Sequence, residues 1–177
     1  MDMFILEAKE ADLPACARVI VDANNPICEA YGFQKNQDSQ AAEERLKDEL
    51  FSGGHVFVGL SGKEIVATFT VNNIAQEKRT FEISKIAVRP ELQKQGLGQK
   101  LLDYALLFIS KQGGQCAYCA FPEANTAVMN WLLKNGFFVD GYFESGSASC
   151  PICILQKSVT PEEGCGGESC GSCDSCE

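Results

Sequence analysis

The sequence predicts a mixed α/β domain of the α+β kind, with a mostly antiparallel central sheet of about six or seven strands flanked by about four helices. A length of 177 residues suits one domain, and shares of 45% hydrophobic and 22% charged residues are typical of a folded soluble protein. Apolar residues recur with strand-like and helix-like periods in the order β, α, α, β, β, β, α, β, α, β, β. We expect the domain to span residues 1–158, followed by a flexible, acidic, cysteine-rich tail over 159–177.

The first part of the chain predicts a strand, a helix, a long irregular segment and a second helix. The stretch FILEAKE has strand character, and Asp12 stands at an N-cap position ahead of a helix with apolar residues at Leu13, Cys16, Ala17, Ile20 and Val21. From Asn24 to Gln40 no period is clear, so we expect an irregular binding segment with a short helix near Cys28 to Tyr31. A helix over 41–51 then ends at Gly53 and Gly54.

The middle of the chain predicts three antiparallel strands and a helix. The strands cover 55–60, 64–72 and 80–88. The helix covers 97–111 and ends at Gly113 and Gly114. The remaining elements are a strand over 115–121, a helix over 124–135, and a strand pair over 137–145 and 151–158.

Composition excludes several classes of function. The net charge of -9 argues against nucleic acid as a partner, because phosphate binding needs a positive surface. No apolar run approaches the roughly 20 residues of a membrane span, and the start MDMFILEAKE does not resemble a secretory signal, so we expect a cytoplasmic protein without membrane partners. Ten cysteines in such a chain indicate free thiols or metal ligands instead of disulfides.

A glycine pair lies between a predicted strand and a predicted helix, in the stretch VRPELQKQGLGQKLL. It is not a dinucleotide fingerprint, because Leu101 stands where GxGxxG needs its third glycine, and no P-loop motif occurs. The first turn of a helix has unpaired N–H groups that bind anions, and glycines at Gly96 and Gly98 would let a phosphate approach them. Lys94 would add a full charge. The alternative is a helix start that packs on the sheet through two small residues.

This segment resembles the acetyl-CoA signature Q/R-x-x-G-x-G/A of the GNAT superfamily of N-acetyltransferases. It follows a strand ending Ile86-Ala87-Val88 and a short Arg89-Pro90-Glu91 connection, as in that family. Downstream, Asn125 and the pair Gly136-Phe137 are spaced like the family's N…GF segment. The resemblance covers about Met3 to Lys157 and implies a GNAT-like fold.

The resemblance also implies that acetyl-CoA is the co-substrate. Backbone amides around the glycine pair would hold the pyrophosphate, the strand before it would pair with the pantetheine arm, and the asparagine would lie beside the pantetheine or the adenine. The residues assigned to the cofactor in this way are Ile86, Ala87, Val88, Gln93, Lys94, Gln95, Gly96, Leu97, Gly98, Gln99, Lys100 and Asn125.

The implied reaction is direct transfer of an acetyl group to a primary amine of a small molecule or a peptide. Such an amine has a pKa of about 10.4 and is almost entirely protonated at pH 7, so a base is needed. Glu82 is the candidate, because it precedes Gln93 by the eleven residues that separate base and motif in the histone-acetylating branch. Its alternative role is that of a polar residue on a half-exposed strand. The backbone N–H of Val88 is the candidate oxyanion donor.

The sequence departs from the family at the general acid, a tyrosine four residues before the glycine of the GF pair. Leu132 occupies that position, and Trp131 lies beside it. Tyr118 or Tyr142 could substitute, or no acid is needed, because a thiol with a pKa of about 8.5 is already a tolerable leaving group. We interpret three aromatic residues of this region as core: Trp131, Phe137 and Phe138.

Four tail cysteines form a C-x4-C-x2-C-x2-C series, namely Cys165, Cys170, Cys173 and Cys176. Four thiolates within so short a stretch could hold zinc or an iron–sulfur cluster, and the alternative is a reduced, disordered tail. Two further pairs are expected to be buried thiols, because residues three apart on a strand point to opposite faces: Cys116 with Cys119, and Cys150 with Cys153. The argument applies to the second pair unless Cys150 lies in the loop ahead of the strand.

Two other functions stay open from the sequence. One is a non-catalytic acyl-CoA-binding sensor or interaction module, which Leu132 favours. The other is a metal- or thiol-binding protein that acts through the tail. The identity of the amine and the choice between monomer and homodimer also stay open.

Overall fold

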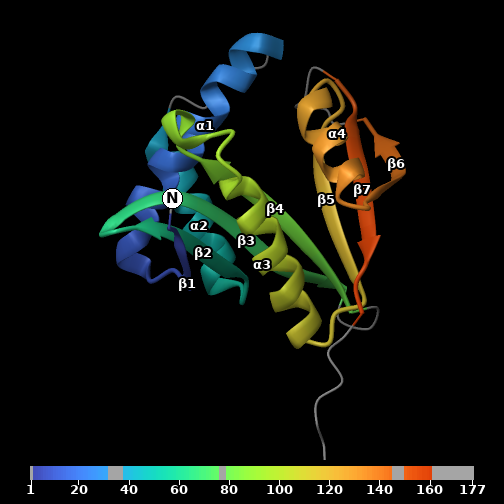
Figure 1. Ribbon diagram of the computed structural model, residues 1–177, viewed down its shortest axis with the longest axis horizontal. Helices are drawn as coiled ribbons and strands as arrows, with labels where there is room; N and C mark the ends of the chain where they lie inside the picture. Colours follow the sequence, from blue (N-terminus) through green and yellow to red (C-terminus); the bar gives the residue numbers. More distant parts are fainter. Residues whose placement is uncertain (1, 32–37, 76–78, 145–149, 161–177) are drawn as a thin grey trace, which may run out of the picture.

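The computed structural model describes residues 2–31, 38–75, 79–144 and 150–160 (Figure 1). Its helices are α1 (Leu13–Tyr31), α2 (Ser39–Phe51), α3 (Leu97–Lys111) and α4 (Thr126–Lys134), with short 3-10 turns at Glu10–Asp12 and Pro90–Leu92. Its strands are β1 (Phe4–Glu7), β2 (His55–Ser61), β3 (Glu64–Ala75), β4 (Thr80–Val88), β5 (Cys116–Pro122), β6 (Phe138–Phe143) and β7 (Ile152–Ser158).

The strands form one seven-stranded sheet in the order β1-β2-β3-β4-β5-β7-β6. Neighbouring strands are antiparallel except β4 and β5, which are parallel. The predicted fold class, a mixed and mostly antiparallel sheet with four helices, is therefore confirmed. Among the described residues, no helix is both long and apolar enough to cross a membrane.

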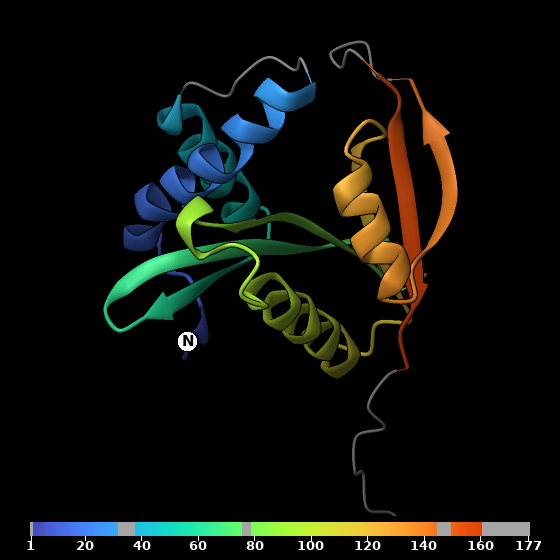
Figure 2. The same ribbon diagram turned by 45° about the horizontal axis from the view of Figure 1, so that its top comes forward.

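Helices cover both faces of the sheet (Figure 2). On one face, α1 and α2 enclose a core that includes Leu13, Ile20 and Leu46. On the other face, α3 and α4 pack on a larger core that includes Phe69, Leu101 and Leu132. The alternation of side chains along each strand sends successive residues into these two cores, so the sheet is buried on both faces at its centre.

The central strand β4 leaves its neighbour β5 partway along its length. The two strands pair only from Thr80 opposite Cys116 to Glu82 opposite Tyr118, and beyond that point they diverge (Figure 1). A bulge in β4 lies where they separate, because the register with β3 shifts between Thr68 and Thr70. Lys85, inside the bulge, has a left-handed backbone with φ of 51°. The bulge therefore leaves one edge of β4 open in the middle of the sheet.

Two sequence predictions about the first helix are wrong. Residues 24–27 are helical instead of irregular, because α1 continues to Tyr31 with Pro26 inside it, whereas the helix expected near Cys28 to Tyr31 is present as the end of α1. Apolar spacing continues past the proline, and Ile27 stays partly buried. Asp12 is not the N-cap of α1: its Oδ2 accepts a bond of 2.9 Å from the N–H of Lys9 and closes the preceding 3-10 turn.

Gly114, just after α3, is expected to be essential for packing. A Cβ at this position would collide with Cγ2 of Ile109 and lie 2.9 Å from Cδ2 of Phe81. Gly114→Ala should therefore lower the free energy of unfolding by about 1–3 kcal/mol. Chemical denaturation measures the loss, with Gly141→Ala as the control, because a Cβ there meets nothing within 4 Å. Equal stability of the two variants would contradict the packing shown.

Candidate active site

The glycine pair begins α3 as predicted. Gly96 is the N-cap, with a left-handed φ of 79°, and its carbonyl accepts the first helical bond from the N–H of Lys100 at 3.2 Å. The amides of the three residues between Gly96 and Lys100 therefore have no carbonyl one turn earlier in the helix to which they could donate. Gly96, as the N-cap, has no side chain that could accept from them. The start of α3 presents these donors at the positive end of the helix dipole.

The space beside the glycines is open. A Cβ on Gly96 would meet no atom within 4 Å, and one on Gly98 would meet only Cζ2 of Trp131, at 3.9 Å. The positive φ accounts for glycine at 96, but Gly98 has an ordinary helical backbone and room for a side chain. Close packing on the sheet, the alternative role of the pair, does not account for Gly98. Access for a bulky group to the first turn does.

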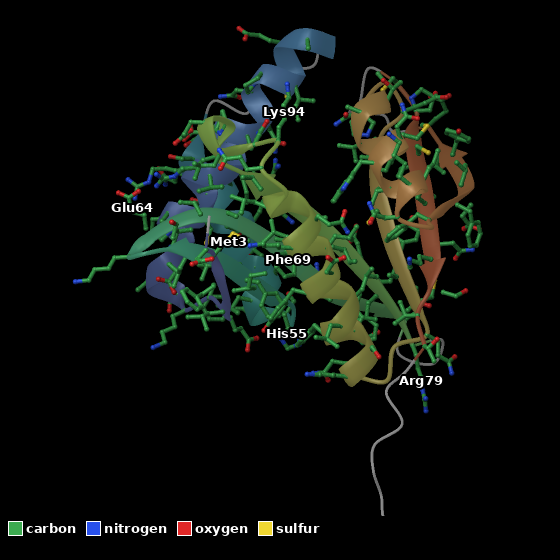
Figure 3. The ribbon with its side chains drawn as sticks, viewed as in Figure 1. Met3, His55, Glu64, Phe69, Arg79 and Lys94 are labelled. Carbon is green, nitrogen blue, oxygen red and sulfur yellow. The ribbon has the colours of Figure 1, made fainter. Side chains whose placement is uncertain are left out.

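The loop between β4 and α3 is tied back to the strand. The Nε2 of Gln93 donates to the carbonyl of Val88 at 3.0 Å, and the Nε2 of Gln95 donates to the carbonyl of Glu91 at 3.4 Å. Lys94 between them has a φ of 60° and an exposed side chain beside the start of α3 (Figure 3). His55, the single histidine, lies at the other end of α3, where its ring contacts Phe108.

Two backbone N–H groups of β4 are directed toward its open edge. The N–H of Arg89 donates to Val66 of β3 at 2.9 Å, and strand alternation then turns the N–H of Val88 away from β3, toward the side that β5 has left. Ala87 pairs with Thr68 of β3, so the amide of Ile86 faces the open side as well. An extended chain of a ligand can pair with this edge as an added strand.

Glu82 stands where β4 and β5 separate. Its neighbours Phe81 and Ile83 are buried against α3, so its own side chain is on the opposite face of the sheet, partly buried. Tyr118 is its partner across the parallel pair and shares that face. Burial raises the pKa of Glu82, Lys85 lowers it and Glu49 raises it. The raised pKa of a partly buried carboxyl is what a general base near neutral pH requires.

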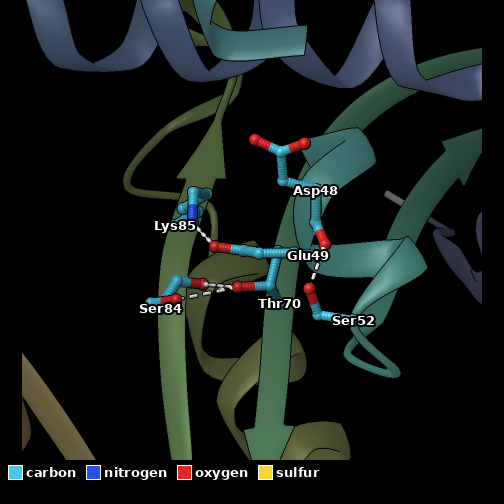
Figure 4. Close-up of polar contacts among 6 residues, drawn as sticks. All are labelled: Asp48, Glu49, Ser52, Thr70, Ser84 and Lys85. Carbon is cyan, nitrogen blue, oxygen red and sulfur yellow. Dashed lines mark hydrogen bonds and ion pairs between the residues drawn. The ribbon is translucent and has the colours of Figure 1, made fainter. Parts of the chain in front are cut away.

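Glu49 and Lys85 form an ion pair beside these residues (Figure 4). Glu49 comes from α2 and reaches the bulge of β4, where the Thr70 and Ser84 hydroxyls are also 2.8 Å apart. Sequence reasoning missed both members of the pair. They are 36 positions apart, and no local motif joins them.

A tyrosine beside Glu82 replaces the absent family tyrosine as a candidate acid. Leu132 is buried in the core and has no proton to give. Burial raises the pKa of Tyr118, as do the carboxylates of Glu82 and Asp140, so this phenol keeps its proton at neutral pH. Tyr142, on the edge strand β6, is half exposed and is not next to Glu82 in the sheet order. Of the two tyrosines considered, Tyr118 fits the role.

Side chains from α4 contact the start of α3. The Nε1 of Trp131 donates to Oε1 of Gln99 at 3.3 Å, and Nε2 of Gln99 donates to Oδ1 of Asn135 at 2.7 Å. Asn125 is the N-cap of α4, accepting from the N–H of Val128 at 3.3 Å.

Phe137 is in the core as predicted, but Phe138 is 49% exposed on the edge strand, so its core assignment is wrong. Trp131 is partly buried beside Gly98.

Three of the four cysteines expected to be buried lie on strands, Cys116 and Cys119 on β5 and Cys153 on β7, whereas Cys150 lies ahead of β7. Cys119 and Cys153 are buried, whereas Cys116 and Cys150 are partly buried, so only one thiol of each pair fits the prediction fully. Burial raises the pKa of Cys119 to about 12. Within the described ranges, no three His, Cys, Asp or Glu residues gather as metal ligands. The four tail cysteines lie outside those ranges, as does the segment 145–149 of the β6–β7 connection.

Comparison with known proteins agrees with this geometry. The profile of the acetyltransferase (GNAT) family matches residues 20–137. Curated proteins give no match to the sequence. Among solved structures, the PaiA N-acetyltransferase from Thermoplasma acidophilum in complex with coenzyme A is similar, with TM-score 0.73 and 18% identity over 89% of this chain and 99% of that chain. The ribosomal-protein-alanine N-acetyltransferase from Brucella melitensis has TM-score 0.70 and 18% identity over 88% and 99%.

Proposed function

The chain belongs to the GNAT family of acetyltransferases, and we propose that it transfers the acetyl group of acetyl-CoA directly to a primary amine of a small molecule or a peptide. The observation that carries this proposal is the start of α3, where Gly98 leaves open space beside unpaired amides without a packing reason. A diphosphate satisfies those amides and the helix dipole together.

The cofactor's parts match successive features of the chain. The pyrophosphate is held by backbone amides within the Gln95 to Lys100 stretch, other than the amide of Lys100, which donates to Gly96, and Lys94 adds charge. Asn125 lies at the start of α4. The pantetheine arm pairs with the open edge of β4 at Ile86 to Val88. Val88 is one candidate donor to the oxyanion. Ile86 faces the same side and is nearer to Glu82, four residues away along the strand instead of six.

Proton transfer is assigned to Glu82 and Tyr118, which lie where β4 and β5 separate. Glu82 accepts the proton of the amine, directly or through water, as the amine nitrogen bonds to the thioester carbon. The tetrahedral intermediate then expels the thiolate of coenzyme A, and the phenol of Tyr118 protonates it. Exchange with solvent then removes the proton from Glu82 and returns one to Tyr118. The products are the acetylated amine and free coenzyme A.

A screen of amines tests the proposal. Purified protein is mixed with acetyl-CoA and candidate amines, including polyamines, amino acids and peptides with a free N-terminus, and acetylated products are detected by mass spectrometry. Mass detection avoids thiol reagents, which the protein's ten cysteines would consume. Coenzyme A binding without acetylation of any amine would favour the sensor function that Leu132 suggests.

The cysteine-rich tail carries a separate proposal, that Cys165, Cys170, Cys173 and Cys176 bind zinc or an iron–sulfur cluster. The spacing of the four thiols is its support. Protein purified without oxygen is expected to contain about one zinc ion or one cluster per chain, and a chain ending at Thr160 is expected to contain none. Equal metal content in the two proteins would refute this site.

A further inference from the structure

Lys85 is held in a backbone conformation that residues with a side chain rarely adopt. Its φ of 51° falls in the left-handed region, and it lies in the bulge that separates β4 from β5. Such strain persists only where the surrounding structure fixes the residue, and it gathers at functional sites. The contacts of the Lys85 side chain are therefore informative.

That side chain is fixed by Glu49, which reaches across from α2. The two side chains are 25% and 21% exposed, so the pair is largely removed from solvent. One oxygen of Glu49 bonds to the Lys85 ammonium, and within the described part of the chain the other oxygen is buried without a hydrogen-bond partner. A half-satisfied buried carboxylate is costly, so a purely structural ion pair is a poor explanation of this arrangement.

The Glu49–Lys85 pair is close enough to Glu82 to affect its carboxyl group. Four titratable groups interact with that carboxyl: Lys85 on its own strand, Glu49 on α2, and Tyr118 and Cys119 on β5. The first two carry opposite charges, and each is bound to the other. Lys85 is three residues from Glu82, close enough to stabilise the carboxylate if its ammonium were free to turn toward it.

We propose that Glu49 is a positioning residue for the transfer reaction: it holds the Lys85 ammonium at the bulge, limits its approach to Glu82, and so keeps Glu82 available as a base. This inference rests on the proposed function, since Glu82 matters as a base only in that reaction. The bond to Glu49 also fixes the bulge that leaves the edge of β4 open.

The two members of the pair make opposite predictions. Glu49→Gln removes a negative charge and releases Lys85, so the pKa of Glu82 should fall. Lys85→Met removes the positive charge, so the pKa of Glu82 should rise. The double variant lacks both charges and should return toward the wild-type value. A pair that only stabilises the fold would give no such reversal of sign.

The test is a ¹³C NMR titration of protein labelled at the glutamate carboxyl carbon, in which the signal lost in Glu82→Gln identifies Glu82. Glu43→Gln is the matched control, because it breaks a second ion pair of the same helix, between Glu43 and Lys47. It should leave the Glu82 titration unchanged. This readout needs no substrate, so it can fail while acetylation succeeds, and acetylation can fail while it succeeds.

With an active amine, Glu49→Gln should also lower kcat at pH 7 by about tenfold, because a weaker base transfers the proton less well. A fall of the Glu82 pKa in Glu49→Gln, a rise in Lys85→Met and a return in the double variant support the proposal. An unchanged Glu82 titration in Glu49→Gln overturns it, and so does a shift of the same sign in both single variants. If a single variant does not fold, the double variant decides: a Glu82 titration far from the wild-type value overturns the proposal.

Discussion

Glu82→Gln is expected to lower kcat by about 100-fold or more and to leave the affinity for coenzyme A unchanged. The amide keeps the shape of the side chain but cannot accept the proton of the amine. The cofactor is expected to pair with the backbone edge of β4 at Ile86 to Val88, whereas the Glu82 side chain projects from one face of the sheet. Cofactor binding should therefore not depend on the charge of Glu82. Steady-state kinetics with an active amine, together with calorimetry for coenzyme A, separate the two effects.

The pH profile gives the same test in the unmodified protein. Because burial raises the pKa of Glu82, the acidic limb of kcat/KM should lie above the range of an ordinary carboxyl group, with activity rising as pH rises through that pKa. Glu82→Gln should remove this limb. Glu44→Gln, which changes an exposed residue of α2, serves as the control and should retain it. An unaltered limb in Glu82→Gln would mean that the base is another group.

Gly98→Val is expected to weaken coenzyme A binding by about 100-fold or more while the protein stays folded. The nearest atom to a Cβ at this position is Cζ2 of Trp131, at 3.9 Å, so the protein can accept the side chain. The methyl groups would occupy the space that a diphosphate needs beside the first-turn amides, and those amides would lose their anion. Isothermal calorimetry measures the loss, and a thermal melt establishes that the fold is intact.

Gly98→Ala is the graded comparison for this prediction, because its single methyl group fills less of the same space and should weaken binding less. Both variants should melt close to the wild-type protein, since a residue with a side chain is favoured over glycine inside a helix. Wild-type affinity in Gly98→Val would show that the diphosphate does not lie at this helix start, and the enzymatic assignment would lose its main support.

The fold could be predicted from sequence where the apolar period was strong. The bounds of β4 and α3 match the predictions, because both segments combine a clear period with glycine or proline at their ends. Residues 24–27 of α1 were predicted to be irregular because Pro26 and the polar residues before it obscure the helical period. Helix α1 packs against α2, and tertiary packing of this kind can sustain a helix that local propensity does not predict.

Some residues of the candidate site could also be predicted from the sequence, and others could not. The start of α3 could be predicted because its residues are contiguous, and Glu82 because its distance from the motif is fixed along one strand. The Glu49–Lys85 pair could not, since a helix and a bulge far apart in the chain form it. The contact of Trp131 with Gln99 likewise depends on how α4 packs, which no spacing in the sequence encodes.

The position of Trp131 has a practical consequence. It is the protein's only tryptophan, and it lies beside Gly98 at the start of α3. Indole emission is sensitive to nearby charge and to exclusion of water, so the intrinsic fluorescence of the unlabelled protein serves as an optical reporter of occupancy at this one place. Titrations can then follow ligand binding at the start of α3 in real time, without dyes and before any acceptor is known.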